Sequence, residues 1–250
     1  MTIAHLNIYA YQRQRIAAAP FAEFVVARVC TGSKRIGDGK IHAEITAGDY
    51  LVVAPGTLLN VENLPPADGP YTSTRLCISH ELLNQQLPTI EPSTKRWTTL
   101  APDRALDQAY AHTEQGLRDG LPDTLLRHRV RELLEALALS GFAPAMENEL
   151  RISERVRLLL AVAPSYDWRA EPIAQKLAMS VATLRRRLAA EQSSFRAVLE
   201  EVRLTYALSL IQSTTQPLKS IAISSGYLSP SRFASRFRER FGTLPSALRD

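Results

Sequence analysis

Two stretches in the second half of the chain resemble each other and restrict what it can fold into. The first, IAQKLAMSVATLRRRL, begins at Ile173, and the second, IAISSGYLSPSRFASRF, begins at Ile221. Each contains an Ile-Ala pair, a tight turn about four residues later, a serine able to cap a helix, and a second amphipathic segment. This order predicts a scaffold helix, a turn and an outward-facing helix in each copy, which is helix-turn-helix spacing.

The apolar positions of the first copy predict which side chains it exposes. Val181, Leu184 and Leu188 recur at helical spacing and are expected to pack on the scaffold helix. The arginine run of this segment therefore points away from the core. The residues predicted on or beside the exposed face are Ala182, Arg185, Arg186 and Arg187.

The second copy has an aromatic buried pair, Phe233 and Phe237, instead of leucines. The residues expected to be exposed are Ser231, Arg232, Ser235 and Arg236, with Arg238 and Arg240 at the rim. An arginine on such a helix can donate two hydrogen bonds to O6 and N7 of guanine, which discriminates that base by about 1–3 kcal/mol. We therefore predict base contacts by Ala182, Arg185, Arg186, Ser231, Arg232, Ser235 and Arg236, and DNA phosphate contacts by Arg187, Arg238 and Arg240.

The spacer between the copies, FRAVLEEVRLTYALSLIQ, has apolar positions at helical spacing along its whole length. As one helix it would span about 27 Å at about 1.5 Å per residue. With the bodies of the flanking units added, the two outward helices would lie near the roughly 34 Å that separates successive major-groove segments on one side of DNA. The spacer therefore predicts a chain that binds DNA through two helices at once.

The charge is divided unequally along the chain. Residues 151–250 carry 16 Lys and Arg against 8 Asp and Glu, whereas residues 1–150 carry 14 against 17. A basic C-terminal part beside a slightly acidic N-terminal part indicates a polyanion-binding module joined to a module with another task. A solvated arginine-rich surface is the alternative explanation of the charge alone.

The N-terminal part has a different pattern. Residues 20–79 contain short Val-, Ile- and Tyr-rich segments separated by turn sequences, which is typical of strands in a barrel or sandwich. Helical patterns follow to residue 142, and 143–153 has the composition of a linker. A broad apolar face on the helix at about 123–141 predicts either a homodimer contact or packing on its own barrel.

Residues 154–250 resemble the DNA-binding domain of the AraC/XylS family of bacterial transcription regulators. The resemblance rests on the paired helix-turn-helix units, on the spacer and on the closing run SIAISSGYLSPSRFASRFRERFGTLPSALR. Leu248 departs from the family pattern, in which an aromatic residue is common, and this predicts a looser last helix. AGDYLVVAPGTLLNV, residues 47–61, is similar to the cupin-type β-barrel that many members carry.

The resemblance implies an α+β protein with a domain at 1–142, made of a cupin-like barrel at about 1–80 and helices at about 80–142. An all-α DNA-binding domain at 154–250 would follow, with its two helix-turn-helix units at about 170–190 and 218–241 joined by a linker helix. The implied function is sequence-specific regulation of transcription, with double-stranded DNA and RNA polymerase as partners. We expect an activator, and the branch of the family that this chain resembles controls virulence and stress genes.

By the same resemblance the barrel would bind a small effector or mediate dimerisation. Some members of that branch sense fatty acids, so an apolar or acidic effector is expected. The residues predicted to hold it are Tyr9, Arg28, Lys34 and Lys219. For Lys219, a phosphate contact and a solvated side chain are alternatives.

A small-molecule-binding cupin or a metal-cupin enzyme with an incidental basic helical domain is the alternative function. A metal cupin needs several converging histidines, and His42 stands alone among the strand segments. We find no HxH, HExxH, GxSxG or phosphate-binding glycine motif. We therefore expect no catalysis, no cofactor and no metal. The short apolar runs and the absence of a signal-peptide pattern predict a cytoplasmic protein that does not enter membranes.

Overall fold

The computed structural model describes residues 3–86, 93–143 and 151–249. The chain divides into two compact units, residues 1–146 and 147–250. Most of the predicted linker at 143–153 lies outside the described residues, because 144–150 are not among them.

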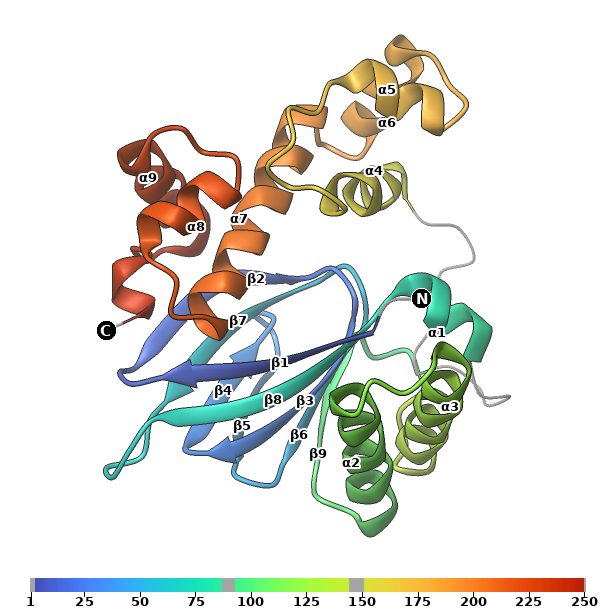
Figure 1. The fold of residues 1–250 in the computed structure, drawn as a ribbon, viewed down its shortest axis with the longest axis vertical. Helices are drawn as coiled ribbons and strands as arrows, with labels where there is room; N and C mark the ends of the chain where they lie inside the picture. The colour runs from blue at the N-terminus through green and yellow to red at the C-terminus, as the bar shows by residue number, and fades with distance from the viewer. Residues whose placement is uncertain (1–2, 87–92, 144–150, 250) are drawn as a thin grey trace. The chain divides into compact units, whose positions relative to one another are not determined.

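Two antiparallel sheets form the first part of the N-terminal unit (Figure 1). The five-stranded sheet has the order β1 (Ile3–Ala10), β8 (Tyr71–Ile78), β3 (Phe24–Thr31), β6 (Tyr50–Val53) and β9 (Trp97–Leu100). The four-stranded sheet has the order β2 (Gln14–Phe21), β7 (Thr57–Leu64), β4 (Ser33–Gly37) and β5 (His42–Thr46). The predicted cupin-like fold is confirmed, in the form of two sheets without full closure, and β9 extends the β structure beyond residue 80.

Alternation along the strands decides which side chains enter the core between the sheets. In β7 the buried positions are Thr57, Leu59, Val61 and Asn63, and the residues between them are exposed or half-buried. Alternate side chains of a strand point to opposite faces, so this pattern leaves one face of the four-stranded sheet open to solvent. The central strands of the other sheet are buried on both faces, because helices cover the face that the core does not use.

Three helices cover that outer face: α1 (His80–Gln86), α2 (Arg104–Arg118) and α3 (Asp123–Leu139). Their apolar residues share one buried cluster with Phe24, Val26 and Tyr50. The buried apolar residues of α3 are Leu126, Val130, Leu133, Leu134, Ala136 and Leu137. The alternative prediction, that this face packs on its own unit, is therefore confirmed for these residues, whereas a homodimer contact through α3 stays a prediction. Leu125 and Leu139 remain 49% and 80% exposed.

The C-terminal unit is helical. Its described elements are α4 (Ile152–Ala161), α5 (Ala170–Lys176), α6 (Val181–Ala190), α7 (Phe195–Ser213), α8 (Leu218–Ser224), α9 (Pro230–Phe241) and the 3₁₀ turn η1 (Ser246–Leu248). Both α4 and α9 contact α7, so one long helix serves two bundles (Figure 1). In the described part of the chain, no helix combines the length and the apolar character needed to cross a bilayer.

Candidate nucleic-acid interface

The two helix-turn-helix units turn in the same way. Ala178 and Gly226 both have left-handed backbones, with φ of +53° and +83°. The amide of Met179 returns to the Ala174 carbonyl at 3.0 Å, and the amide that follows Gly226 makes the corresponding bond at 2.9 Å. This is the Schellman arrangement, which ends a helix and turns the chain sharply. The predicted turns are confirmed, and the first one forms although alanine is strained in this conformation.

Serine caps begin both outward helices, as predicted. Ser180 Oγ accepts a hydrogen bond from the Thr183 amide at 3.1 Å, and Ser229 Oγ accepts one from the Arg232 amide at 3.3 Å. Each cap satisfies an amide that the helix leaves unpaired, which typically contributes about 1 kcal/mol. Leu228 is the extra residue of the second unit, and it is fully exposed.

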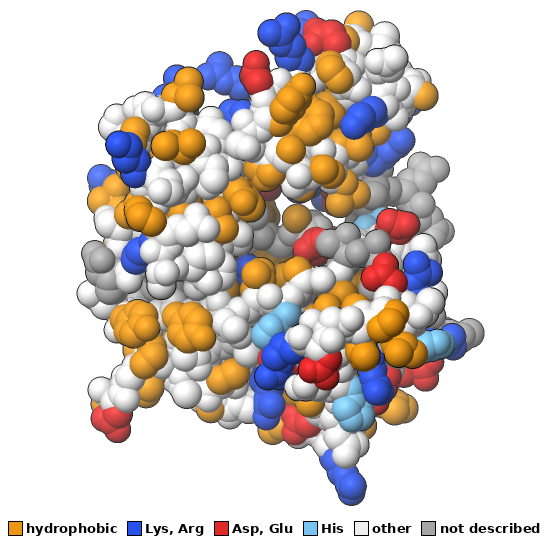
Figure 2. All heavy atoms as spheres, in the orientation of Figure 1, with side chains coloured by type: hydrophobic (Ala, Val, Ile, Leu, Met, Phe, Trp, Pro, Cys, Tyr) orange, Lys and Arg blue, Asp and Glu red, His pale blue; other side chains and the backbone are white. Residues whose placement is uncertain are grey.

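The α6 helix buries Leu184 and Leu188 and turns its basic residues outward, as predicted. Its exposed residues include Ala182, Arg185, Arg186 and Arg187. Among the described residues, no carboxylate forms an ion pair with these arginines. Unpaired guanidinium groups on one helix are available to an external anion. On the face drawn in Figure 2, basic side chains border the helical unit and acidic ones are fewer there.

The α9 helix buries Phe233, Phe237 and Phe241 as a row of edge-on rings, with 5.6 Å and 4.7 Å between neighbouring centroids. Its exposed residues include Ser231, Arg232, Ser235 and Arg238. Arg240 is half-buried, and its guanidinium lies 5.2 Å from the centre of the Phe241 ring. The aromatic row fixes the direction in which the exposed side chains point.

Arg236 differs from the other predicted base-reading arginines, because two carboxylates hold it. Its Nε lies 3.2 Å from Glu200 of α7, and its Nη1 lies 2.8 Å from Glu239 of α9. These neighbours raise the pKa of the Arg236 guanidinium, the Glu239 hydrogen bond being the largest cause. DNA would have to compete with both glutamates for this side chain.

The polar residues of α7 that face its two bundles were not among the predicted functional residues. Glu201 pairs with Arg157 of α4 at 3.0 Å, and Glu200 pairs with Arg236 of α9. A signal was present, because Glu200, Glu201 and Arg203 interrupt an otherwise apolar pattern in the spacer. Adjacent helix positions point in different directions, so neighbouring glutamates reach different partners.

The end of the chain is well packed, contrary to the looser last helix predicted from Leu248. This leucine of η1 is only 2% exposed. Arg249 Nη2 donates to the Thr214 carbonyl at 3.1 Å, and Nη1 donates to the Gln216 carbonyl. The last described residues are therefore tied to the loop between α7 and α8.

The three predicted effector residues of the N-terminal unit face different surroundings. Tyr9 is 44% exposed on β1. Arg28 lies on the helix-covered side of its sheet, 5.8 Å from the centre of the Tyr50 ring and 3.9 Å from the Asp107 carboxylate. Lys34 is enclosed between the sheets, so these three side chains do not form one site. Lys219 belongs to the C-terminal unit and is exposed on α8.

Lys34 is a buried cation without a carboxylate partner among the described residues. It is 7% exposed, its ammonium donates to Asn63 Oδ1, and its Nζ lies 5.1 Å from the centre of the Tyr71 ring. Burial, and to a lesser extent repulsion by Arg75, lower the pKa of Lys34 to about 7. Arg75 Nε is itself buried without a hydrogen-bond partner in the described part of the chain. The alternation in YTSTRLCI could have placed Arg75 beside Lys34 in the interior.

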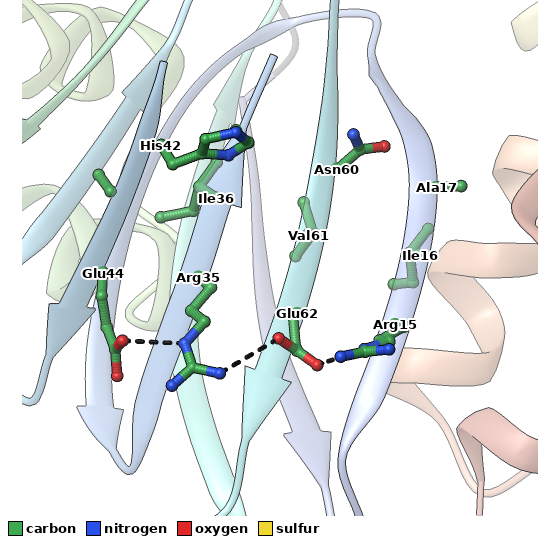
Figure 3. A pocket seen from close by; sticks show the side chains of 12 residues that line it. Arg15, Ile16, Ala17, Arg35, Ile36, His42, Glu44, Asn60, Val61 and Glu62 are labelled. Atoms are coloured by element: carbon green, nitrogen blue, oxygen red, sulfur yellow. Dashed lines mark hydrogen bonds and ion pairs between the residues drawn. The ribbon is translucent and has the colours of Figure 1, made fainter. Parts of the chain in front are cut away.

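A groove of about 600 Å³ lies on the open face of the four-stranded sheet (Figure 3). Arg15, Glu62, Arg35 and Glu44 stand opposite one another on four adjacent strands. Figure 3 shows Arg35 between the two glutamates, 2.9 Å from Glu44 and 3.6 Å from Glu62. Hydrogen bonding, first from Arg13 and then from Arg15, lowers the pKa of Glu62 to about 2 despite partial desolvation. These charged side chains form ion pairs with one another, so the groove needs no charged ligand to neutralise them.

No three His, Cys, Asp or Glu side chains of residues 3–86, 93–143 and 151–249 are grouped so that they could hold a metal ion.

Comparison with known proteins supports the interpretation of the helical unit. Residues 173–250 match the family described as helix-turn-helix domain. The transcriptional regulator YdeO of Escherichia coli K12 is 32% identical over 125 residues, which are 47% of this chain and 49% of YdeO. The regulator GadX of the same strain is 33% identical over 107 residues, 42% of this chain and 39% of GadX. The matches thus span half or less of these relatives.

Crystal structures of ToxT from Vibrio cholerae share the fold over nearly the whole chain. One aligns with a TM-score of 0.65 at 16% identity and covers 98% of this chain and 95% of ToxT. Another, with an unsaturated fatty acid bound to ToxT, aligns with a TM-score of 0.61 at 16% identity, covering 98% and 93%. At this identity the likeness shows the fold alone. The matched family and the curated relatives identify a helix-turn-helix domain in the C-terminal unit.

Proposed function

We propose that the protein is a transcription regulator that binds double-stranded DNA through α6 and α9. The observation that carries this proposal is the exposed arginine run of α6, which has no carboxylate partner among the described residues. YdeO and GadX, which match the same part of the chain, are named as transcriptional regulators. An exposed basic helix that follows a tight turn is suited to the major groove.

The length of α7 supports contact of one chain with two major-groove segments of DNA. It has 19 residues, which span about 28 Å at about 1.5 Å per residue. Successive major-groove segments on one side of DNA are separated by roughly 34 Å. Because α6 and α9 belong to bundles on the same helix, we propose that each enters one of two successive segments.

The proposed contacts divide into two classes. Base edges would be contacted by Ala182, Arg185, Arg186, Ser231, Arg232 and Ser235, with Arg236 joining after release from Glu239. Phosphates would be contacted by Arg187, Arg238 and Arg240. Base contacts confer sequence preference, whereas phosphate contacts strengthen binding to any DNA and make it depend on salt.

A salt titration on selected DNA tests this function. The full chain would first select duplexes from a random pool, and its affinity for the selected duplex would then be measured at several salt concentrations. We expect affinity to fall steeply with salt, and Arg187→Ala to reduce the slope of log K against log salt by about 1. Arg127→Ala, an exposed arginine of α3, is the matched control. Failure to select any sequence, or equal affinity at about 50 and about 300 mM salt, would contradict the proposal.

We also propose that an acidic, apolar small molecule binds the N-terminal unit at Lys34. A carboxylate could pair with this ammonium, which has no ion-pair partner among the described residues, and with the nearby Arg75. The fatty acid bound to ToxT gives the chemical class to try. Tyr9, Arg28 and Lys219 are secondary candidates, because Tyr9 and Lys219 are exposed and Arg28 lies beside the Asp107 carboxylate.

Thermal denaturation tests the effector. We expect a long-chain unsaturated fatty acid to raise Tm, and the alcohol of the same chain length to raise it much less, because only the acid carries the charge. In Lys34→Met the difference between acid and alcohol should disappear. Equal shifts with acid and alcohol, or none with either, would remove the charge-pairing idea.

We further propose that DNA binding activates transcription through contact with RNA polymerase, in the cytoplasm, where a bacterial chromosome is read. Transcription in vitro from a promoter carrying the selected duplex, with and without the protein, measures the sign of the effect. A decrease in transcript would make the protein a repressor. We do not propose catalysis, because the relatives are named as transcription regulators.

A further inference from the structure

We infer that Arg203 of α7 is a positioning residue that fixes the separation of the two recognition helices and thereby the half-site spacing that the protein accepts. This inference rests on the proposed DNA binding. It concerns a residue that carries none of the proposed DNA contacts. The support comes from four sets of contacts around one turn of α7.

Toward the first helix-turn-helix unit, Arg203 binds two backbone carbonyls. Its Nε donates to the Pro164 carbonyl at 3.0 Å, and its Nη2 donates to the Tyr166 carbonyl at 3.0 Å. Both acceptors lie in the loop between α4 and α5. Hydrogen bonds from a charged planar donor to two acceptors set direction as well as distance. The guanidinium therefore holds that loop at a defined place along α7.

Toward the second unit, the same guanidinium lies against the turn at Gly226. A Cβ atom added to Gly226 would come within 2.7 Å of Arg203 Nε and 2.8 Å of its Cζ. The glycine is thus required twice, for its φ of +83° and for the close approach of this side chain. The turn that leads into α9 is therefore placed by the group that also holds the α4–α5 loop.

Two neighbouring glutamates extend this connection. Glu201 pairs with Arg157 of α4 at 3.0 Å, and Glu200 pairs with Arg236 of α9 at 3.2 Å. All four side chains are about one-fifth to one-third exposed, so their charges are only partly screened. The EEVR segment of α7 thus contacts both helix-turn-helix units within one turn of helix.

This arrangement has a consequence for DNA. Two modules on a stiff connection gain affinity only when the distance between their sites matches the connection, whereas loosely joined modules tolerate several distances. Arg203 restricts rotation of the two helix-turn-helix units about α7. The wild-type protein should accordingly prefer one half-site spacing sharply.

The test compares duplexes of different spacing. The probe is the duplex selected by the wild-type protein, with 1 or 2 base pairs inserted between or removed from its halves, and with one half scrambled. For wild type we expect each change in spacing to reduce affinity strongly. For Arg203→Met we expect roughly tenfold weaker binding to the unmodified duplex, with a much smaller further loss when the spacing changes. Binding to the duplex with one intact half should stay within about twofold of wild type.

Three comparisons keep the test decisive. Arg203→Lys keeps the charge but not the planar pair of donors, so it should also lose spacing preference, and it provides a second variant if Arg203→Met fails to fold by circular dichroism. Arg196→Met, an exposed arginine on the same helix, should keep the wild-type preference. Wild-type spacing preference in both folded Arg203 variants, or an equal loss on the duplex with one intact half, would overturn the inference. Absence of any sequence-specific binding by wild type would instead overturn the proposed function.

Discussion

In the N-terminal unit Arg35 lies between two glutamates and Lys34 is enclosed by the sheets, whereas in the C-terminal unit the arginines of α6 are exposed without carboxylate partners among the described residues. Cations of the first kind are satisfied or hidden by the fold itself. Cations of the second kind are stabilised mainly by water and are free for an external anion. In this molecule the pairing of a cation, rather than its presence, distinguishes the surface that we propose to bind DNA.

Arg236 lies between these two kinds. It is on a recognition helix, yet Glu200 and Glu239 hold it as tightly as the glutamates of the four-stranded sheet hold Arg35. The first helix-turn-helix unit thus presents more available positive charge than the second. We therefore expect α6 to dominate sequence preference and α9 to contribute less.

The largest expected effect is the loss of the unpaired arginines. The double variant Arg185→Ala/Arg186→Ala should lose about 1–3 kcal/mol of discrimination between the selected duplex and random DNA for each base contact removed. Fluorescence anisotropy on both duplexes measures this difference. Arg35→Ala, which removes a paired arginine of the other unit, is the control and should leave both affinities unchanged. Equal losses on selected and random DNA would reassign Arg185 and Arg186 to phosphates.

The next effect is the pH dependence of stability that the buried Lys34 causes. The folded-state pKa of Lys34 is about 7, below its ordinary value of about 10.5, so between these two pH values the unfolded chain binds more protons than the folded chain. Stability should therefore rise with pH between about 7 and about 10.5, by up to about 1.4 kcal/mol per pH unit, and the cost of the buried charge should be fully present below pH 7. Urea unfolding of Lys34→Met should lack this rise, whereas the exposed-lysine control Lys40→Met should retain it. If the free energy of unfolding of Lys34→Met depended on pH in the same way as that of the wild type, the lysine would stay charged on folding.

A smaller effect is expected from freeing Arg236. Removing its partner by Glu239→Gln should strengthen binding to the selected duplex by up to about 1 kcal/mol, because DNA no longer competes with that carboxylate. The control is Glu171→Gln, an exposed glutamate of α5 that removes the same charge from the same unit. If both variants strengthen binding equally, the effect is that of net charge and Arg236 is not released.

The smallest effect is expected in the paired surface row. Glu62→Gln should change the free energy of unfolding by about 1 kcal/mol or less, because the arginines around Glu62 are half or more exposed and solvent screens such pairs. It should leave DNA affinity unchanged. Chemical denaturation and anisotropy measure the two quantities. A change in DNA affinity would mean that the open sheet face takes part in binding.

Much of the helical unit could be predicted because its signals are local. A capping serine, the apolar positions of α6 and the small residue of each turn act within a few residues of chain, so their spacing predicted the turns, the caps and the burial of Leu184 and Leu188. The same reasoning failed for Arg236, because the pattern that exposes it carries no information about Glu200, which lies 36 positions earlier.

The N-terminal unit shows where sequence reasoning stops. The strand pattern determined that Lys34 and Arg35 point to opposite faces, since successive side chains of a strand alternate. It did not determine which of the two faces is enclosed, because that depends on which sheet packs on the other. Tertiary structure alone decided that Lys34 is buried, that Arg35 joins the outer row and that the apolar face of α3 packs within its own unit. Local spacing specifies helices, caps and turns, whereas the partners of a charged side chain are set by elements that only folding brings together.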